Sequence, residues 1–302
     1  MSVTFSINFK NVEPLKPESN SLSNNGLYLK GDSGATAVLI HGLTGTPNEM
    51  RFLATFLNKK FGYSVYCPRL ANHGEPLTIL KKTTWQDCYE SVKNAFMQIR
   101  ETHTGPFFAS GLSMGALLSI LLANEFKNEI AGISCISPTL FYDGWNIPWY
   151  RCFLPIIYST PLKNFFYFKE DPPYGIKNKA LQERVHKYYS NATLNDNTGV
   201  TDFGYPYYPA NLLHQLHLLV KYLKTVLPSI RVPLQLIQAQ NDDLTSVKNS
   251  AFIYDRVNSE LKEMVLLNNS YHVITADQER ATAAQKMAAF FSRATKNHVQ
   301  IL

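Results

Sequence analysis

A serine set between two glycines is the feature of this sequence best suited to chemistry. Residues 111–115 read Gly-Leu-Ser-Met-Gly, which places Ser113 at the centre of a Gly-x-Ser-x-Gly pattern. An apolar run precedes the pattern and a helical run follows it, so we expect a sharp turn from a strand into a helix. Glycines leave room in such a turn where side chains would collide with the backbone. Ser113 is therefore the candidate nucleophile.

A serine hydroxyl attacks only when a base accepts its proton, so a histidine must accompany it. The Gly-x-Ser-x-Gly pattern alone arises by chance in roughly one chain of this length in ten, which makes the partners decisive. His272 follows the last predicted strand, 263–267, and precedes a helix. A lone loop histidine is usually just solvated, but this order along the chain favours catalysis.

An imidazole base needs a carboxylate that fixes its tautomer and stabilises its charged form. Asp242 and Asp243 both follow the strand predicted over 234–239. Adjacent acids in a loop more often cap a helix, so we expect Asp243 to start the next helix. Asp242 is then the candidate acid.

A tetrahedral intermediate carries a new negative oxygen, which needs N–H donors already in place. One candidate donor is the backbone amide of Met114, directly after the nucleophile. The other is the amide of Leu43, in the loop 41–45 that follows the first visible strand. His41 in the same loop precedes the nucleophile at a strand end, and we expect it to be structural.

No metal or cofactor site is expected. His214 and His217 are spaced i, i+3, but no carboxylate or third ligand accompanies them. The four cysteines lie far apart without a Cys-x-x-Cys pair, and residues 1–30 lack the apolar core of a secretion signal. No apolar run is long enough to cross a membrane. Cytoplasmic location is the expectation, and scattered Lys and Arg with a net charge of +6 favour no nucleic-acid partner.

Short apolar runs bounded by Gly or Pro predict the buried strands that hold these residues. Helical stretches separate the runs, so the pattern predicts an α/β fold with a mostly parallel, doubly wound sheet. The predicted strands are 37–41, 64–67, 107–110, 130–137, 234–239 and 263–267. The predicted helices are 50–59, 85–101, 116–125, 247–257 and 278–293.

One interval, 138–231, breaks the alternation, and no strand-like run appears in it. We interpret it as a mainly helical cap inserted into a single catalytic domain made of 1–137 and 232–302. Its first part is dense in aromatic residues, with twelve between positions 141 and 174 against 13% for the whole chain. These rings suit a water-excluding roof over an acyl pocket, a membrane-facing surface, or the cap's own core.

Four segments together resemble the small bacterial carboxylesterases and monoacylglycerol lipases of the α/β-hydrolase superfamily, across nearly all of the catalytic domain. Segment 41–45 looks like their oxyanion loop, 111–115 like their nucleophile turn, 238–242 like their acid loop and 270–277 like their histidine loop. The resemblance implies the α/β-hydrolase fold, and it places the acid on Asp242 and the oxyanion donors on Leu43 and Met114. The chain departs from the family at Asn72, where its relatives have glycine, and in its longer cap.

These observations predict hydrolysis of lipophilic carboxylic esters, such as monoacylglycerols or lysophospholipids, through an acyl-serine intermediate. A small lipophilic ester is the expected partner, with transient membrane contact through the cap. A thioesterase or an acyltransferase would use the same three residues, and both alternatives stay open. A hydrolase fold kept only for binding is a third hypothesis, although such proteins usually lose a triad residue and none is missing here.

Overall fold

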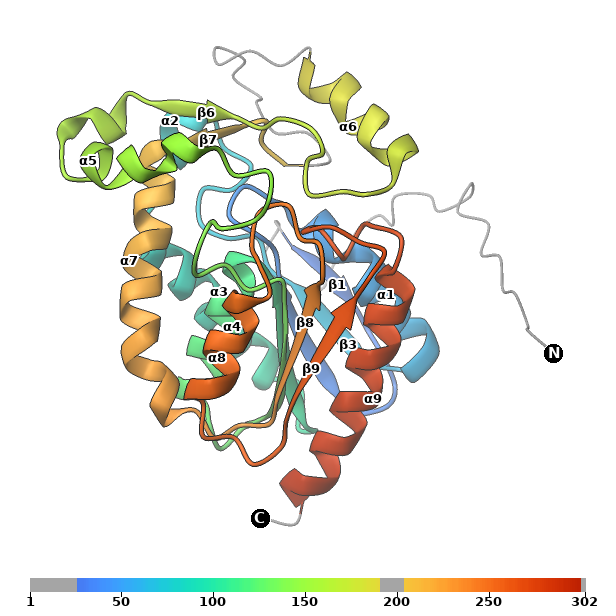
Figure 1. The fold of residues 1–302 in the computed structure, drawn as a ribbon. Helices are drawn as coiled ribbons and strands as arrows, with labels where there is room; N and C mark the ends of the chain where they lie inside the picture. The colour runs from blue at the N-terminus through green and yellow to red at the C-terminus, as the bar shows by residue number, and fades with distance from the viewer. Residues whose placement is uncertain (1–25, 191–203, 300–302) are drawn as a thin grey trace.

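A seven-stranded sheet lies at the centre of the protein, in the strand order β1-β3-β2-β4-β5-β8-β9 (Figure 1). The structure is a computed structural model that describes residues 26–190 and 204–299. Strand β1 runs antiparallel to β3 at one edge, and the other pairs in this sheet are parallel. The strands are β1 (Leu27–Leu29), β2 (Thr36–Ile40), β3 (Ser64–Cys67), β4 (Phe107–Leu112), β5 (Ile130–Ile136), β8 (Leu234–Ala239) and β9 (Lys262–Leu267).

Helices cover both faces of the sheet because the inner strands are apolar on both sides. In β2, Ala37 and Leu39 pack in one core while Val38 and Ile40 pack in the other, as the alternation of a strand requires. The first core is shared with α1 (Arg51–Phe61) and α9 (Arg280–Val299). The second is shared with α3 (Trp85–Arg100), α4 (Met114–Glu125), α7 (Ala210–Val226) and α8 (Lys248–Arg256).

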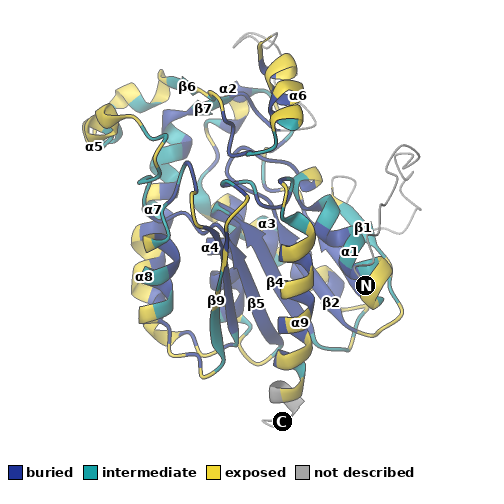
Figure 2. Cartoon of the chain, turned by 45° about the vertical axis from the view of Figure 1, so that its right-hand side comes forward, coloured by how far each residue is buried: buried dark blue, intermediate teal, exposed yellow. Residues whose placement is uncertain are grey.

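The predicted α/β fold with a mostly parallel, doubly wound sheet is confirmed. Each of the six predicted strands is present near its expected bounds, and the five predicted helices correspond to α1, α3, α4, α8 and α9. The inner strands of the sheet are dark blue in Figure 2 because helices cover both of their faces, whereas the edge strands β1 and β9 are only partly buried. Strand β1 was not predicted, since its three half-buried residues are too few to show a pattern.

The insertion contains a second, two-stranded sheet, so the expectation that 138–231 holds no strand is wrong. Strand β6 (Tyr167–Lys169) pairs antiparallel with β7 (Tyr207–Pro209). Three-residue strands are too short for alternation to reveal them. Around them lie the short helix α5 (Leu154–Tyr158) and α6 (Lys179–Ser190), and Figure 1 shows this layer above the sheet's carboxyl edge.

Helix α7 falls inside the predicted insertion and contacts both layers, α3 and α4 of the body as well as α5 and β7 of the cap. Its Leu216, Leu219 and Leu223 belong to the core that lies between the sheet and helices α3 and α4. We infer that the cap proper ends near β7, and that α7 carries the chain from the cap back into the domain.

Among the helices of residues 26–190 and 204–299, none combines the length and hydropathy that crossing a bilayer would need. The four cysteines are free thiols. Cys67, Cys88 and Cys135 are buried, whereas Cys152 is exposed.

Candidate active site

The backbone at Ser113 is held in a strained turn between β4 and α4. Ser113 has φ 58° and ψ −115°, a conformation that residues other than glycine rarely adopt. A Cβ atom on Gly111 would lie 2.2 Å from the backbone of Gly115, and one on Gly115 would lie 2.2 Å from the carbonyl oxygen of Ile40. The two glycines therefore allow α4 to start directly behind the serine, close against β2.

His272 and Asp242 form a buried pair beside this turn. His272 Nδ1 lies 3.0 Å from Asp242 Oδ2 and 3.1 Å from Oδ1. The carboxylate also accepts hydrogen bonds from the backbone amides of Leu244 and Thr245 and from the Gln238 side chain, each at 2.8 Å. These donors fix the acid, and the acid in turn orients the imidazole.

The electrostatics of His272 favour its charged form. Burial opposes protonation, but the charge of Asp242, its hydrogen bond and the charge of Asp243 outweigh burial and raise the pKa of His272 above its ordinary value. Such an environment stabilises the imidazolium that forms when a histidine accepts a proton.

The hydroxyl of Ser113 is turned toward Thr139 in this structure. The two hydroxyl oxygens are 2.9 Å apart, and the part of the chain that the structure describes gives Ser113 no hydrogen bond to His272. Catalytic hydrogen bonds are often formed only when substrate is present, so a rotation about the serine Cα–Cβ bond is needed before attack. No pattern in the sequence pointed to Thr139.

The two residues predicted to supply oxyanion donors, Leu43 and Met114, both lie near Ser113. The amide of Met114 is the first of α4, and N–H groups in the first turn have no partner within the helix. Leu43 lines the same cavity as Ser113, and its carbonyl oxygen accepts a hydrogen bond of 2.7 Å from His73 Nε2. The preceding amide, that of Gly42, donates to Glu49 Oε2 at 2.9 Å.

His41 and Asn72 maintain the loops around this oxyanion site. Both ring nitrogens of His41 contact the backbone, with Nδ1 donating to the carbonyl of Gly42 and Nε2 accepting from the amide of Leu70. Asn72 has φ 58°, a left-handed conformation that glycine adopts without strain. Asparagine tolerates this region better than other side chains, so the loop keeps its shape.

Asp243 does not start a helix, and that expectation is wrong. Helix α8 begins at Lys248, five positions later, and Asp143 accepts the amide hydrogen of Ser246 near its start. The buried carboxylate of Asp243 instead accepts hydrogen bonds from the amides of His272 and Gly175. The sequence could not reveal this arrangement, because Gly175 lies far from Asp243 along the chain.

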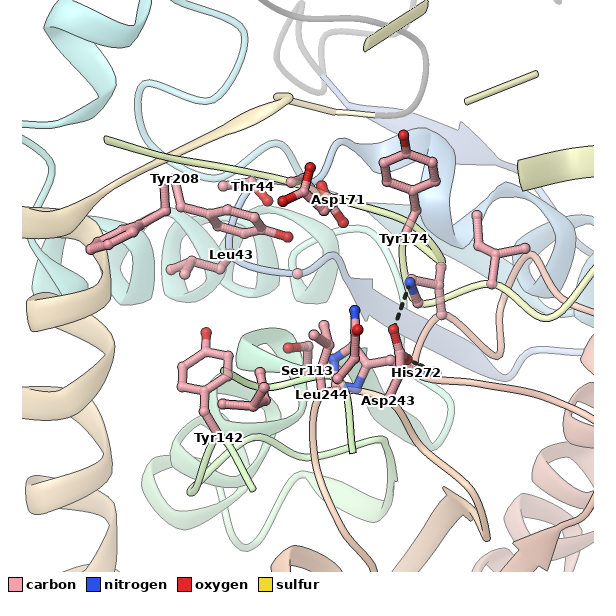
Figure 3. A pocket seen from close by; sticks show the side chains of 18 of the residues that line it. Leu43, Thr44, Ser113, Tyr142, Asp171, Tyr174, Tyr208, Asp243, Leu244 and His272 are labelled. Atoms are coloured by element: carbon pink, nitrogen blue, oxygen red, sulfur yellow. Dashed lines mark hydrogen bonds between the residues drawn. The ribbon is translucent and has the colours of Figure 1, made fainter. Parts of the chain in front are cut away.

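A cavity of about 380 Å³ joins Ser113 and His272 to the underside of the cap (Figure 3). Most of its lining is apolar or aromatic, including Leu43, Tyr142 and Tyr208. Two glutamates face it as well. Burial raises the pKa of Glu49 to about 7, although a hydrogen bond from the Gly42 amide lowers it. Burial also raises the pKa of Glu170 to about 8, although a hydrogen bond with Tyr208 lowers it.

The twelve aromatic residues of the cap occupy different positions: some line the cavity, some pack inside the protein, and others are exposed. Tyr142, Tyr150, Phe168 and Tyr174 line the cavity. Phe141 and Tyr167 pack against the main core, and Tyr158 packs on α7, with its ring stacked on that of His214. Six rings are exposed: Trp145, Trp149, Tyr150, Phe153, Phe165 and Phe166.

His214 and His217 therefore lie against Tyr158. No group of three metal-binding side chains occurs within residues 26–190 and 204–299.

The model of the serine aminopeptidase S33 family matches residues 31–279, most of the chain. The chain belongs to this family. The S33 hydrolase is 29% identical over 258 residues to a thermostable monoacylglycerol lipase of Bacillus sp. (strain H-257), covering 85% of this chain and 90% of that protein. It is 23% identical over 256 residues to a carboxylesterase of Bacillus subtilis (strain 168), covering 85% and 92%.

The S33 hydrolase is also similar to solved structures of lipolytic enzymes. One of the metagenome-derived lipolytic enzymes LipS and LipT superposes with a TM-score of 0.72 and 27% identity, covering 89% of this chain and 97% of that one. The protein is thus a serine hydrolase, as the sequence predicted.

Proposed function

We propose that the protein hydrolyses carboxylic esters of lipophilic acids through an acyl intermediate on Ser113. The observation that carries the proposal is the pairing of His272 with Asp242 on the apolar cavity that also contains Ser113. An apolar cavity favours a hydrocarbon acyl chain, since the hydrophobic effect drives its burial.

In the first half of the reaction, Ser113 Oγ attacks the ester carbonyl carbon while His272 Nε2 takes the hydroxyl proton. The amides of Leu43 and Met114 donate to the resulting oxyanion. The bond to the alcohol oxygen then breaks, and His272 returns the proton to the departing alcohol. Ser113 is left carrying the acyl group as an ester.

In the second half, His272 removes a proton from water as the water oxygen attacks the acyl carbon. Collapse of the second tetrahedral intermediate breaks the bond to Ser113 Oγ, which recovers its proton from His272. The free acid leaves, and Asp242 keeps the imidazole oriented in both halves.

The substrate class within this proposal is a fatty acyl ester such as a monoacylglycerol. The similarity to a monoacylglycerol lipase and a carboxylesterase supports ester hydrolysis, and it does not favour the thioesterase or acyltransferase alternatives. Turnover of esters of one alcohol with increasing acyl length, measured beside the matching thioesters, tests this choice.

The experiment for the nucleophile is intact-mass analysis after incubation with a fluorophosphonate probe. Wild type should gain the mass of one phosphonyl group, and Ser113→Ala should gain none and lose ester turnover by several orders of magnitude. The conservative Ser119→Ala, a buried serine of α4, should label like wild type. Retained labelling or turnover in Ser113→Ala would overturn the assignment.

We also propose that the cap contacts a membrane surface. Eight large apolar or aromatic side chains between positions 145 and 166 are at least 46% exposed, and α5 protrudes at one end of the cap (Figures 1 and 2). Between Trp145 and Lys169 the chain has three basic residues and no acidic one. Exposed aromatic rings with positive charge suit the headgroup region of anionic lipids.

Sedimentation with vesicles tests this contact. The protein should bind phosphatidylglycerol vesicles more than phosphatidylcholine vesicles, and the double variant Trp149→Ser/Phe165→Ser should bind neither, because these two side chains are 78% and 75% exposed. Met97→Ser, at an exposed apolar residue of α3, is the matched control. Equal binding by the double variant and the control would contradict the proposal.

A further inference from the structure

One buried carboxylate connects the cap to the histidine loop. Asp243 Oδ1 accepts the amide hydrogen of His272 at 3.2 Å, and Asp243 Oδ2 accepts that of Gly175 at 3.1 Å. The Asp243 side chain is buried at the wall of the cavity. Hydrogen bonds to an ionised acceptor are stronger than those between neutral groups.

The cap loop and the histidine loop also contact each other directly. The amide of Val273 donates to the carbonyl of Gly175 at 2.7 Å. Gly175 has φ +69°, and a Cβ atom there would lie 2.7 Å from Val273 Cγ2 and 3.2 Å from His272 Cβ. The cap backbone therefore rests on the histidine with no space for a side chain between them.

The start of the cap is tied to the same acid loop. The amide of Asn146 donates to the carbonyl of Asp243, and that of Gly144 donates to the carbonyl of Leu244, both at 3.0 Å. Trp145 Nε1 donates to the carbonyl of Asn241 at 3.0 Å. Two distant cap segments thus converge on residues 241–244.

We propose that Asp243 is a positioning residue that couples the place of the cap to the orientation of His272. Its carboxylate is shared by one amide of the cap and one of the histidine loop, so movement of the cap away from the body disturbs the backbone that carries the base. The inference rests on the proposed role of His272 in ester hydrolysis.

The charge of Asp243 gives this coupling a measurable signature. Three ionisable groups interact with its carboxylate, namely His272, Asp242 and Glu170. Burial and the charge of Asp242 raise the pKa of Asp243 to about 6, against the opposing effect of His272. Burial lowers the pKa of His272, whereas Asp242 and, to a smaller extent, the charges of Asp243 and Glu49 raise it.

The decisive variant is Asp243→Asn, assayed on a short-chain ester that stays neutral across the pH range. An asparagine can accept one of the two amide hydrogens but presents an NH₂ group to the other. We expect kcat to fall roughly 10-fold or more with KM changed less, because the base is misplaced. We also expect the acid limb of kcat/KM to move to lower pH, since His272 loses a neighbouring negative charge.

Ser137→Ala is the matched control, because Ser137 Oγ donates to the carbonyl of His272 at 2.8 Å without adding charge. It should lower kcat and leave the acid limb in place. An acid limb that stays in place for Asp243→Asn, or moves equally in both variants, overturns the proposal.

Hydrogen exchange tests the coupling itself. In Asp243→Asn, peptides covering 172–178 and 268–276 should both exchange faster than in wild type, while Ser137→Ala should affect only the second. Asp243→Ala serves if the asparagine variant does not fold. Faster exchange in 268–276 alone would show that the cap is not coupled through Asp243, whereas failure of the ester-hydrolase proposal would appear as unlabelled, inactive wild type.

Discussion

The nucleophile rests in a position that does not yet support attack. Its hydroxyl is bonded to Thr139, and the base is held by a separate set of contacts to Asp242. A hydrogen bond contributes about 1 kcal/mol, so breaking this one adds about that much to the free energy of turning Ser113 toward His272.

The change Thr139→Val removes that resting bond and keeps a branched side chain of similar volume. We expect the rate of fluorophosphonate labelling to rise by up to about 5-fold, because the productive rotamer of Ser113 loses its competitor. The second-order labelling constant measures this directly. A large decrease would instead assign Thr139 a role in catalysis.

The pH dependence of wild type follows from the base. His272 must be neutral to accept the serine proton, and its pKa is raised. Activity should therefore fall as pH drops, with a midpoint above the ordinary histidine value of about 6.5. The pH profile of kcat/KM with a neutral ester provides the midpoint. A midpoint below pH 6 would show that the pKa of His272 is not raised.

At the scale of elements, the turn at Ser113 and the acid loop could be predicted because they follow β4 and β8, which are buried along their whole length. Strand β9, before His272, was predicted as a buried strand but is a half-exposed edge strand. Strands β6 and β7 could not be predicted, since three residues show no period. The end of the cap could not be predicted either, because the amphipathic sequence of α7 suits packing against a cap and packing against α4 equally well. The roles of Thr139 and Asp243 depend on contacts between distant segments, which spacing cannot reveal.

The loop with Asn72 allows a stability test. Asn72→Ala should lower the free energy of unfolding by about 1 kcal/mol or more, because alanine resists φ 58° and the bond from Asn72 Nδ2 to Thr83 Oγ1 is lost. Asn72→Gly loses the same bond but fits the backbone, so it should cost less. Urea denaturation of both variants gives the comparison, and equal losses would argue against backbone strain.

At the scale of the whole molecule, folding of the cap removes the Glu170 carboxyl group from water. The pKa of Glu170 is raised to about 8, so the folded protein holds that proton more tightly than the unfolded chain does. Stability should then fall as pH rises from about 4.5 to 8.

The variant Glu170→Gln isolates this contribution. Between pH 5.5 and 8.5 the wild-type free energy of unfolding should drop by on the order of 2 kcal/mol more than that of the variant. Denaturant titrations at the two pH values measure the difference. Parallel behaviour of the two proteins would mean that Glu170 is solvated.

The exposed Cys152 has a practical consequence. Burial raises the pKa of the Cys88 thiol to about 12 and those of Cys67 and Cys135 further, so these three are poor nucleophiles toward maleimides. Cys152 lies among the exposed rings of the cap and is accessible. The native chain should therefore take a single fluorescent or spin label, at Cys152 on its proposed lipid-facing surface. The depth of this label in a bilayer can then be measured without introducing any cysteine.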